Sequence, residues 1–290
     1  MMEKKLKKIS KKVNFFLNSY LSKSNSSELI APMKYGLFPG GKKIRSKIIY
    51  DVGKIFKVKH KDLLIIAASV EAIHAYSLIH DDLPCMDDDR LRRGKLSTHI
   101  KFGESTAILA GNSLLTTAFE ILSDRNFKLD EKNKSRLINL LSRCSGQIGI
   151  AGGQYLDLSY ERKKVSLQKI LNMELKKTGK LFEFCCVAPL IIKNNNKDLN
   201  TFSKLGKDIG LLFQIVDDLI DFKGKTKFAG KKTNKDAKKG KATIISLLGY
   251  ENAVKYANKL KQNIFNKLRP YSSNANELIK TINFIMYRKK

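Results

Sequence analysis

The sequence predicts an all-α fold in a single domain that spans residues 1–290. Apolar residues recur at the three- and four-residue spacing of helices along nearly the whole chain, and alternating patterns that would indicate strands are hard to find. No Ser-, Pro- or Gly-rich stretch separates one half from the other. With 290 residues and 42% hydrophobic content, the chain can bury one full core.

The first helix, expected over Lys4–Tyr20, is amphipathic. Its apolar residues share one face and are Leu6, Ile9, Val13, Phe16 and Tyr20. That stripe could meet a protein core or a lipid surface. We expect the core, because docked terminal helices are the commoner outcome. The segment has no small-residue cleavage site, so we do not expect a secretory signal.

Eight further helices follow from the same periodicity. In chain order they are expected over Lys43–Phe56, Asp62–His80, Thr106–Leu122, Lys132–Ile150, Leu167–Ala188, Asn200–Asp221, Thr243–Phe265 and Ala275–Met286. Two of them, Asp62–His80 and Thr106–Leu122, are apolar around much of their circumference, which is typical of helices packed inside a large bundle. Polar residues on such helices therefore need an explanation.

The net charge of +29 comes from 56 Lys and Arg against 27 Asp and Glu. These lysines are spread along the chain and are not interleaved with stacking aromatics, so we expect a solvated basic surface and no specific nucleic-acid partner. The apolar runs are shorter than the ~20 residues that span a bilayer, so integral membrane association is not expected. The four cysteines form no Cys-x-x-Cys pair, which favours a reducing cytoplasm.

Two acid clusters stand out because they follow or lie within apolar helices. The first, Asp81 to Asp89, contains five aspartates, and the second contains Asp217, Asp218 and Asp221. Together they hold eight of the chain's 27 acidic residues. Either cluster alone could be a solvated helix end. Carboxylates this close need a cation, and ligation by oxygen alone indicates Mg²⁺, which commonly bridges carboxylates to phosphate.

Basic residues near glycines could hold that phosphate. Gly40 and Gly41 precede Lys42 and Arg45 at the start of a helix, where backbone N–H groups favour anions. Further candidates are Arg92 and Arg93 after the first cluster, His74 seven residues (~10.5 Å) before Asp81, Lys177 with Thr178, and a segment containing Lys231 and Lys241. By themselves, these residues could also be surface lysines, ion pairs of neighbouring aspartates or a core histidine.

The two acid clusters resemble the paired aspartate-rich motifs of the trans-isoprenyl diphosphate synthases. The matching residues are Asp81-Asp82-x₄-Asp87 before Arg92-Arg93-Gly94, and Asp217-Asp218-x₂-Asp221. Other matching segments follow in the family's order and cover nearly all of the chain: Gly40–Arg45, Gly152–Leu158, Lys177–Gly179, Phe213-Gln214 and Gly240–Thr243.

This resemblance implies a homodimer of mostly antiparallel helix bundles around a central cavity, with three Mg²⁺ ions bound together with the allylic diphosphate. It implies that the metal ligands are Asp81, Asp82, Asp87, Asp217, Asp218 and Asp221. The allylic diphosphate would be assisted by Arg92, Lys177, Thr178, Gln214, Lys231 and Lys241. The diphosphate of isopentenyl diphosphate would be bound by Lys42, Arg45, His74 and Arg93. The catalytic set would be Asp81, Asp82, Asp87, Arg92, Lys177, Asp217 and Asp218.

Product length is expected to depend on Tyr76 and Ser77. Tyr76 lies five residues, ~7.5 Å along a helix, before Asp81. An aromatic residue there, with Pro84-Cys85 inserted in the first motif, resembles bacterial farnesyl diphosphate synthases. The substrates would then be isopentenyl, dimethylallyl and geranyl diphosphates.

Three alternatives remain open at this point. The nearest is a geranylgeranyl diphosphate synthase. A non-catalytic partner subunit would commonly lack an acid motif, whereas both are intact here. A basic nucleic-acid or membrane-surface module would bind with steep salt dependence and show no turnover. Three positions depart from the family pattern, namely Ser46, Asn112 and Ile244, and none of them is an expected metal ligand.

Overall fold

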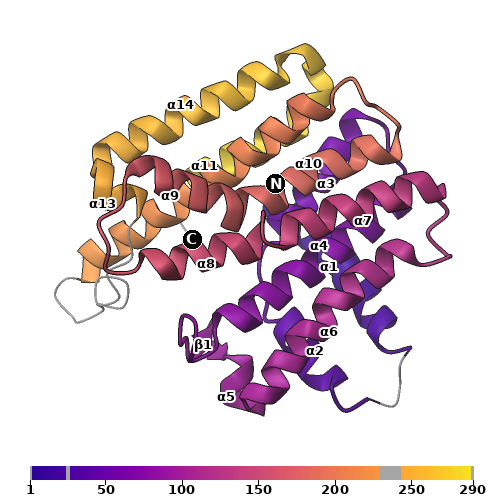
Figure 1. The fold of residues 1–290 in the computed structure, drawn as a ribbon. Coiled ribbons are helices and arrows are strands. Elements are labelled where there is room, and N and C mark those ends of the chain that lie inside the picture. Colours follow the sequence, from indigo (N-terminus) through magenta and orange to yellow (C-terminus); the bar gives the residue numbers. More distant parts are fainter. Residues whose placement is uncertain (1, 24–26, 229–242, 289–290) are drawn as a thin grey trace. The chain divides into compact units, whose positions relative to one another are not determined.

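A computed structural model describes residues 2–23, 27–228 and 243–288 (Figure 1). It is mostly helical, so the all-α prediction is confirmed. The chain divides into two compact units. Unit 1 comprises Met1–Asn139 and Ala188–Asn194, and unit 2 comprises Leu140–Val187 and Asn195–Lys290. The single-domain interpretation stays a prediction.

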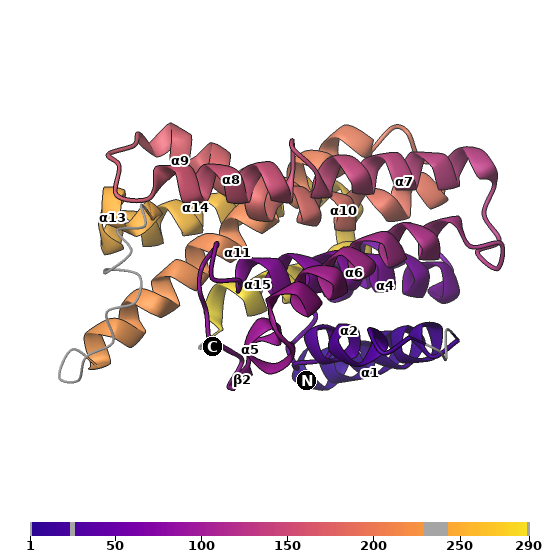
Figure 2. The same ribbon diagram turned by 60° about the horizontal axis from the view of Figure 1, so that its bottom comes forward.

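Unit 1 is built around helix α4. Its elements are α1 (Met2–Leu21), α2 (Ile30–Leu37), α3 (Ile44–Ile55), α4 (His60–Asp81), β1 (Leu91–Arg92), β2 (Lys95–Leu96), α5 (Thr98–Phe102), α6 (Glu104–Ser123) and the first part of α7 (Glu131–Ser145). Helix α4 packs against α6, α3, α1 and α2. In Figure 2, α1 and α2 lie side by side on one side of α4.

Unit 2 is built around the long helix α11. Its elements are α8 (Ile150–Tyr160), α9 (Leu167–Glu174), the π-helix η1 (Leu175–Gly179), most of α10 (Lys180–Ile192), α11 (Leu199–Phe228), α13 (Ile244–Leu248), α14 (Tyr250–Leu268), the 3₁₀ helix η2 (Arg269–Ala275) and α15 (Asn276–Tyr287). Helix α11 packs against α14, η1, α15 and α13, and η1 also packs against α8 and α9.

The apolar stripe of α1 faces the core. Leu6, Val13 and Leu17 are at most 4% exposed, so the expectation of a docked terminal helix is correct. Among the described helices, only α4 is long and apolar enough to span a membrane by length and composition. The expectation that every apolar run is too short to do so did not take this helix into account. Because 67% of the qualifying stretch is buried inside the protein, the packing is that of a core helix.

Glycines account for two helix boundaries that periodicity placed wrongly. The helix expected over Lys132–Ile150 ends at Ser145, and α8 begins at Ile150; in the turn between them only glycine fits at Gly149, where a side chain would collide with the carbonyl of Cys144. The helix expected over Thr243–Phe265 is interrupted at Gly249, whose φ of 74° lies in the left-handed region. Periodicity continues across such breaks because the apolar residues on both sides still face one core.

Candidate functional site

The first aspartate cluster forms a compact loop at the C-terminal end of α4. Backbone N–H groups of Asp87 and Asp89 donate to the carbonyl oxygens of Asp81 (2.8 Å) and Asp82 (3.1 Å). Through these hydrogen bonds the loop folds back on the end of α4, so that the backbone of Asp87 lies beside that of Asp81. Asp82 is 2% exposed, whereas Asp81 and Asp87 are half-buried. Of the three expected metal ligands in this loop, one carboxylate is therefore buried and two are partly exposed to solvent.

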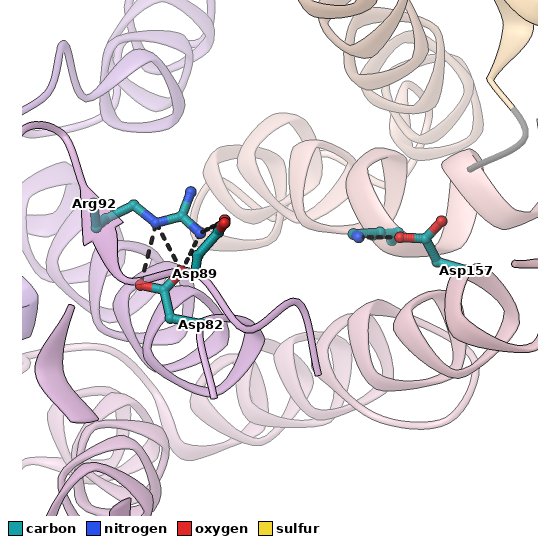
Figure 3. Close-up of polar contacts among 5 residues, drawn as sticks. Asp82, Asp89, Arg92 and Asp157 are labelled. Atoms are coloured by element: carbon teal, nitrogen blue, oxygen red, sulfur yellow. Dashed lines mark hydrogen bonds and ion pairs between the residues drawn. The ribbon is translucent and has the colours of Figure 1, made fainter. Parts of the chain in front are cut away.

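A two-residue hairpin delivers Arg92 to this loop. Strands β1 and β2 pair with Arg92 opposite Lys95, and the turn residues Arg93 and Gly94 both have positive φ (53° and 78°), as a type I′ turn requires. The Nε of Arg92 donates to Asp82 at 2.9 and 3.2 Å, and its Nη2 also contacts Asp82 and lies 3.4 Å from Asp89 (Figure 3). Although Arg92 lowers it, the pKa of Asp82 is raised, mainly by burial.

The same hairpin places Arg93 against the turn formed by Gly40 and Gly41. Its Nη1 donates to the carbonyl oxygen of Gly40. Gly41 has a φ of +116°, and a Cβ at this position would collide with the guanidinium of Arg93. The positive φ therefore favours glycine here, and any other residue would also push the guanidinium of Arg93 away from Gly40. Lys42, which follows in sequence, is exposed.

Arg45 and His74 lie together in unit 1. Nη1 of Arg45 is 3.3 Å from Nε2 of His74. Burial, followed by the charges of Arg45 and Arg93, holds the pKa of His74 well below its usual value. The charges of these two arginines act on the imidazole in the same direction, so the local potential is positive and favours an anion.

Glu71 is a residue of this cluster that sequence reasoning missed. It is 5% exposed, its Oε1 accepts a hydrogen bond from Ser46 Oγ (2.6 Å), and its Oε2 pairs with Lys43 Nζ at 3.3 Å. Burial alone would raise the pKa of Glu71, but Lys43, Ser46 and Arg45 together lower it. Ser46 departs from the family pattern, and here it has a structural role. The signal was an acidic residue within the apolar helix α4.

The second cluster lies on α11. Asp217 and Asp218 are half-buried and Asp221 is exposed. Burial raises the pKa of Asp218 to about 7 although a hydrogen bond from Gln214 lowers it, and the charges of Asp221 and Asp217 raise it further. The buried Oδ2 of Asp218 has no hydrogen-bond partner among the described residues. This carboxyl would be stabilised by a bound cation.

Gln214 connects the second cluster to the π-helix. Thr178 Oγ1 donates to Gln214 Oε1 (3.1 Å), and Gln214 Nε2 donates to Asp218 Oδ1 (3.0 Å). Lys177, in the same π-helix, pairs with Asp157 Oδ2 at 2.6 Å (Figure 3). A π-turn shifts the register of the following side chains and often marks functional sites. Asp157 and the π-turn were both missed from the sequence.

Arg288 reaches the second cluster from the C-terminal end of α15. Its Nη2 donates to Asp217 Oδ1 (2.6 Å) and to the carbonyl oxygen of Phe213 (3.0 Å). The guanidinium carbon lies 3.9 Å from the centre of the Phe213 ring, and the side chain is 5% exposed. From sequence alone, nothing indicated that the C-terminal segment returns to the aspartates.

The remaining expected site residues are placed as follows. Tyr76 is half-buried on α4, with its ring 5.2 Å from that of His80 in an edge-on contact. Ser77 is 8% exposed, and its hydroxyl donates to the carbonyl oxygen of His74. Lys231 and Lys241 lie outside the described residues. The structure thus brings together the expected residues within each unit, with the first cluster in unit 1 and the second in unit 2.

The donor chemistry fits Mg²⁺. Both clusters offer carboxylate oxygens only, and the buried, unpartnered Oδ2 of Asp218 would gain from a positive charge. Across the part of the chain that the structure describes, no three His, Cys, Asp or Glu side chains are arranged as a ready metal cage.

Comparison with known sequences finds one matching family and relatives that are prenyl diphosphate synthases. The model of the polyprenyl synthetase family matches residues 26–282. Farnesyl diphosphate synthase from Escherichia coli (strain K12) is 42% identical over 238 residues, which cover 81% of this chain and 80% of that protein. The Micrococcus luteus farnesyl diphosphate synthase is 37% identical over 293 residues, covering 100% of each. The chloroplastic geranylgeranyl pyrophosphate synthase of Catharanthus roseus is 35% identical over 259 residues, with 88% and 72% covered.

Solved structures that resemble this chain include two geranyltransferases. A geranyltransferase from Legionella pneumophila superposes with a TM-score of 0.86 at 31% identity, covering 100% of this chain and 97% of that one. The geranyltransferase of Helicobacter pylori, complexed with magnesium and isoprenyl diphosphate, has a TM-score of 0.78 at 28% identity, with 98% and 96% covered.

Proposed function

This chain belongs to the polyprenyl synthetase family and is a trans-prenyltransferase with the isoprenoid synthase fold, and from that premise we propose that it makes (E,E)-farnesyl diphosphate. It would condense isopentenyl diphosphate first with dimethylallyl diphosphate and then with geranyl diphosphate. The proposal includes a homodimer and a cytoplasmic location. Farnesyl diphosphate synthases are among its most similar relatives, but a geranylgeranyl pyrophosphate synthase is 35% identical, so the product length needs its own test.

The observation that carries the proposal is the arrangement of cations in unit 1. Arg45 contacts His74, and Arg93 is anchored by the carbonyl oxygen of Gly40, directly after the loop of the first aspartate cluster. We assign Lys42, Arg45, His74 and Arg93 to the diphosphate of isopentenyl diphosphate. An uncharged imidazole can donate a hydrogen bond to a phosphate oxygen while the guanidinium groups supply charge.

The allylic diphosphate is assigned to the aspartates and their neighbours. Magnesium, when bound, would supply positive charge to the departing diphosphate. We propose that three Mg²⁺ ions bind, and that their protein ligands are Asp81, Asp82, Asp87, Asp217, Asp218 and Asp221. The proposed direct contacts to diphosphate are Arg92, Lys177, Thr178, Gln214, Lys231 and Lys241.

The chemistry then needs no covalent nucleophile. Arg92 and Lys177 stabilise the negative charge that develops as the C1–O bond of the allylic substrate breaks. The double bond of isopentenyl diphosphate attacks the resulting cation at C1, forming the new carbon–carbon bond. A proton leaves C2 of the isopentenyl unit for the released diphosphate, and the new trans double bond forms.

Purified protein incubated with isopentenyl and dimethylallyl diphosphates is expected to yield farnesyl diphosphate only when Mg²⁺ is present. Product is measured by chromatography of the dephosphorylated prenyl alcohols. Excess EDTA should abolish turnover, and added Mg²⁺ should restore it, because oxygen-only sites bind this ion reversibly. Absence of magnesium-dependent condensation would contradict the proposed reaction. Magnesium-dependent formation of geranylgeranyl diphosphate as the main product would retain the reaction class and replace the proposed product.

Tyr76→Ala is expected to lengthen the main product by at least one isoprene unit. Tyr76 is the half-buried aromatic residue one and a half helical turns before Asp81, and its removal opens space where we propose that the growing chain ends. Tyr76→Phe keeps the ring and should leave the product unchanged. The measurement is product chain length. An unaltered product from Tyr76→Ala would show that another residue limits chain growth.

A further inference from the structure

The solvent-facing side of α1 is strongly basic. Between Met2 and Lys12 this helix carries six lysines and one glutamate, a net charge of +5. Five of these lysines are exposed, namely Lys4, Lys7, Lys8, Lys11 and Lys12. The buried residues Leu6, Val13 and Leu17 occupy the opposite side of the helix. The helix is therefore held by one face and presents lysines on the other.

Phe15 lies on the same side of α1 as these lysines, about one turn after the last of them, Lys12. Its side chain is 75% exposed, the most exposed among the large hydrophobic side chains of the described residues. At about 100° per residue, Phe15 lies within roughly 40° of Lys4, Lys8 and Lys11 around the helix axis. It lies roughly 160° from Val13, on the core side. Because α1 already buries a separate apolar stripe, packing of the helix does not explain this exposed ring.

We propose that the Lys4–Phe15 face of α1 docks the protein on an anionic lipid surface. Lysines at the level of the headgroups gain electrostatic attraction, and a single aromatic ring can enter the boundary between headgroups and acyl chains. Figure 2 shows α1 at the edge of unit 1, with the N-terminus at one end of the helix. The core stripe stays buried, so docking in this way leaves the packing of α1 unchanged.

A lipid surface fits this face better than a nucleic acid does. The exposed cations of α1 are all lysines, which act as point charges and lack the planar fork with which arginine reads phosphates and bases. Phe15 is the one exposed aromatic residue on the helix, whereas binding of single strands relies on successive stacking platforms. One exposed ring at the end of a row of lysines matches instead the pattern of an interfacial anchor.

The experiment uses fluorescence, because the chain has no tryptophan. Phe15→Trp places a single reporter on the basic face, and Leu247→Trp places one at a 43% exposed position on α13 as a control. We expect vesicles containing phosphatidylglycerol to shift the emission of Phe15→Trp to shorter wavelength and to leave Leu247→Trp unchanged. Phosphatidylcholine vesicles alone should shift neither, and 0.5 M salt should reverse the shift by screening.

The need for the α1 lysines is tested in the Phe15→Trp protein. Replacing Lys4, Lys7, Lys8 and Lys11 with Gln should weaken vesicle binding about 100-fold or more, at about fivefold per lysine. The matched control replaces Lys163, Lys164, Lys255 and Lys259, which are exposed lysines of unit 2, and so removes the same charge. It should weaken binding less than tenfold.

Three outcomes would overturn the proposal. Equal losses for the two lysine sets would mean that net charge alone drives binding. An emission shift caused by a single-stranded oligonucleotide and not by vesicles would assign the face to nucleic acid. No response to either would leave α1 as a solvated face. Prenyl transfer in detergent-free buffer should be unaffected by the α1 variants, so failure of this proposal is separate from failure of the proposed reaction.

Discussion

Asp82→Asn is expected to lower kcat for prenyl transfer about 1000-fold. Asp82 is a proposed metal ligand and is 2% exposed, and its carboxylate holds the guanidinium of Arg92 through hydrogen bonds of 2.9 and 3.2 Å from Nε. The neutral amide would weaken metal binding and release Arg92 from its orientation. Both effects remove charge stabilisation where diphosphate departs. Steady-state kinetics at saturating Mg²⁺ measure the change.

The matched control is Asp89→Asn. This residue lies in the same loop and approaches Arg92 at 3.4 Å, but its side chain is 34% exposed and it is outside the proposed metal ligands. It should lose less than tenfold in kcat. Circular dichroism should show that both variants are folded at the assay temperature. Equal losses for Asp82→Asn and Asp89→Asn would mean that the charge of the whole loop matters and that Asp82 has no special role as a ligand.

The sequence predicted the elements and residues whose signal is local. The spacing of Asp81, Asp82 and Asp87 identified the first cluster. The starts of the long periodic helices were found to within about two residues, whereas the end of α11 lies at Phe228, seven residues beyond the expected Asp221. Short elements were missed for a physical reason. The hairpin at Arg92 has two residues per strand, which is too few for an alternating pattern of polar and apolar residues. The one local signal was Gly94, because a glycine is common where a turn needs a positive φ.

Contacts between residues distant in sequence were beyond prediction. Arg288 lies 71 residues from Asp217, and no local pattern connects a cation near the C-terminus with a carboxylate on α11. The π-helix containing Lys177 has the composition of an ordinary helix, so its extra residue per turn became visible only in the structure. Such features depend on packing, which the periodicity of one helix does not encode.

Glu71 gives the second prediction. Glu71→Gln is expected to lower the free energy of unfolding by about 3 kcal/mol at pH 7, because it leaves the ammonium of Lys43, whose side chain is 8% exposed, without its counter-charge. Glutamine can still accept the hydrogen bond from Ser46, so the loss is chiefly that of the charge pair. Urea unfolding measures it. Glu277→Gln, which disrupts a 3.4 Å pair with Lys280 and leaves an ammonium whose side chain is 52% exposed to solvent, should change stability little.

The pH dependence of this difference tests its cause. The folded-state pKa of Glu71 lies below the value of 4.5 for a free glutamate, because Lys43, Ser46 and Arg45 outweigh burial. A lowered folded-state pKa contributes stability that is fully present above the unfolded-state pKa and lost as the pH falls through the folded-state pKa. The difference between wild type and Glu71→Gln should therefore be constant from pH 7 to about 5 and shrink below 4.5. A difference that grows on acidification would mean that burial dominates and that the cations around Glu71 do not compensate it.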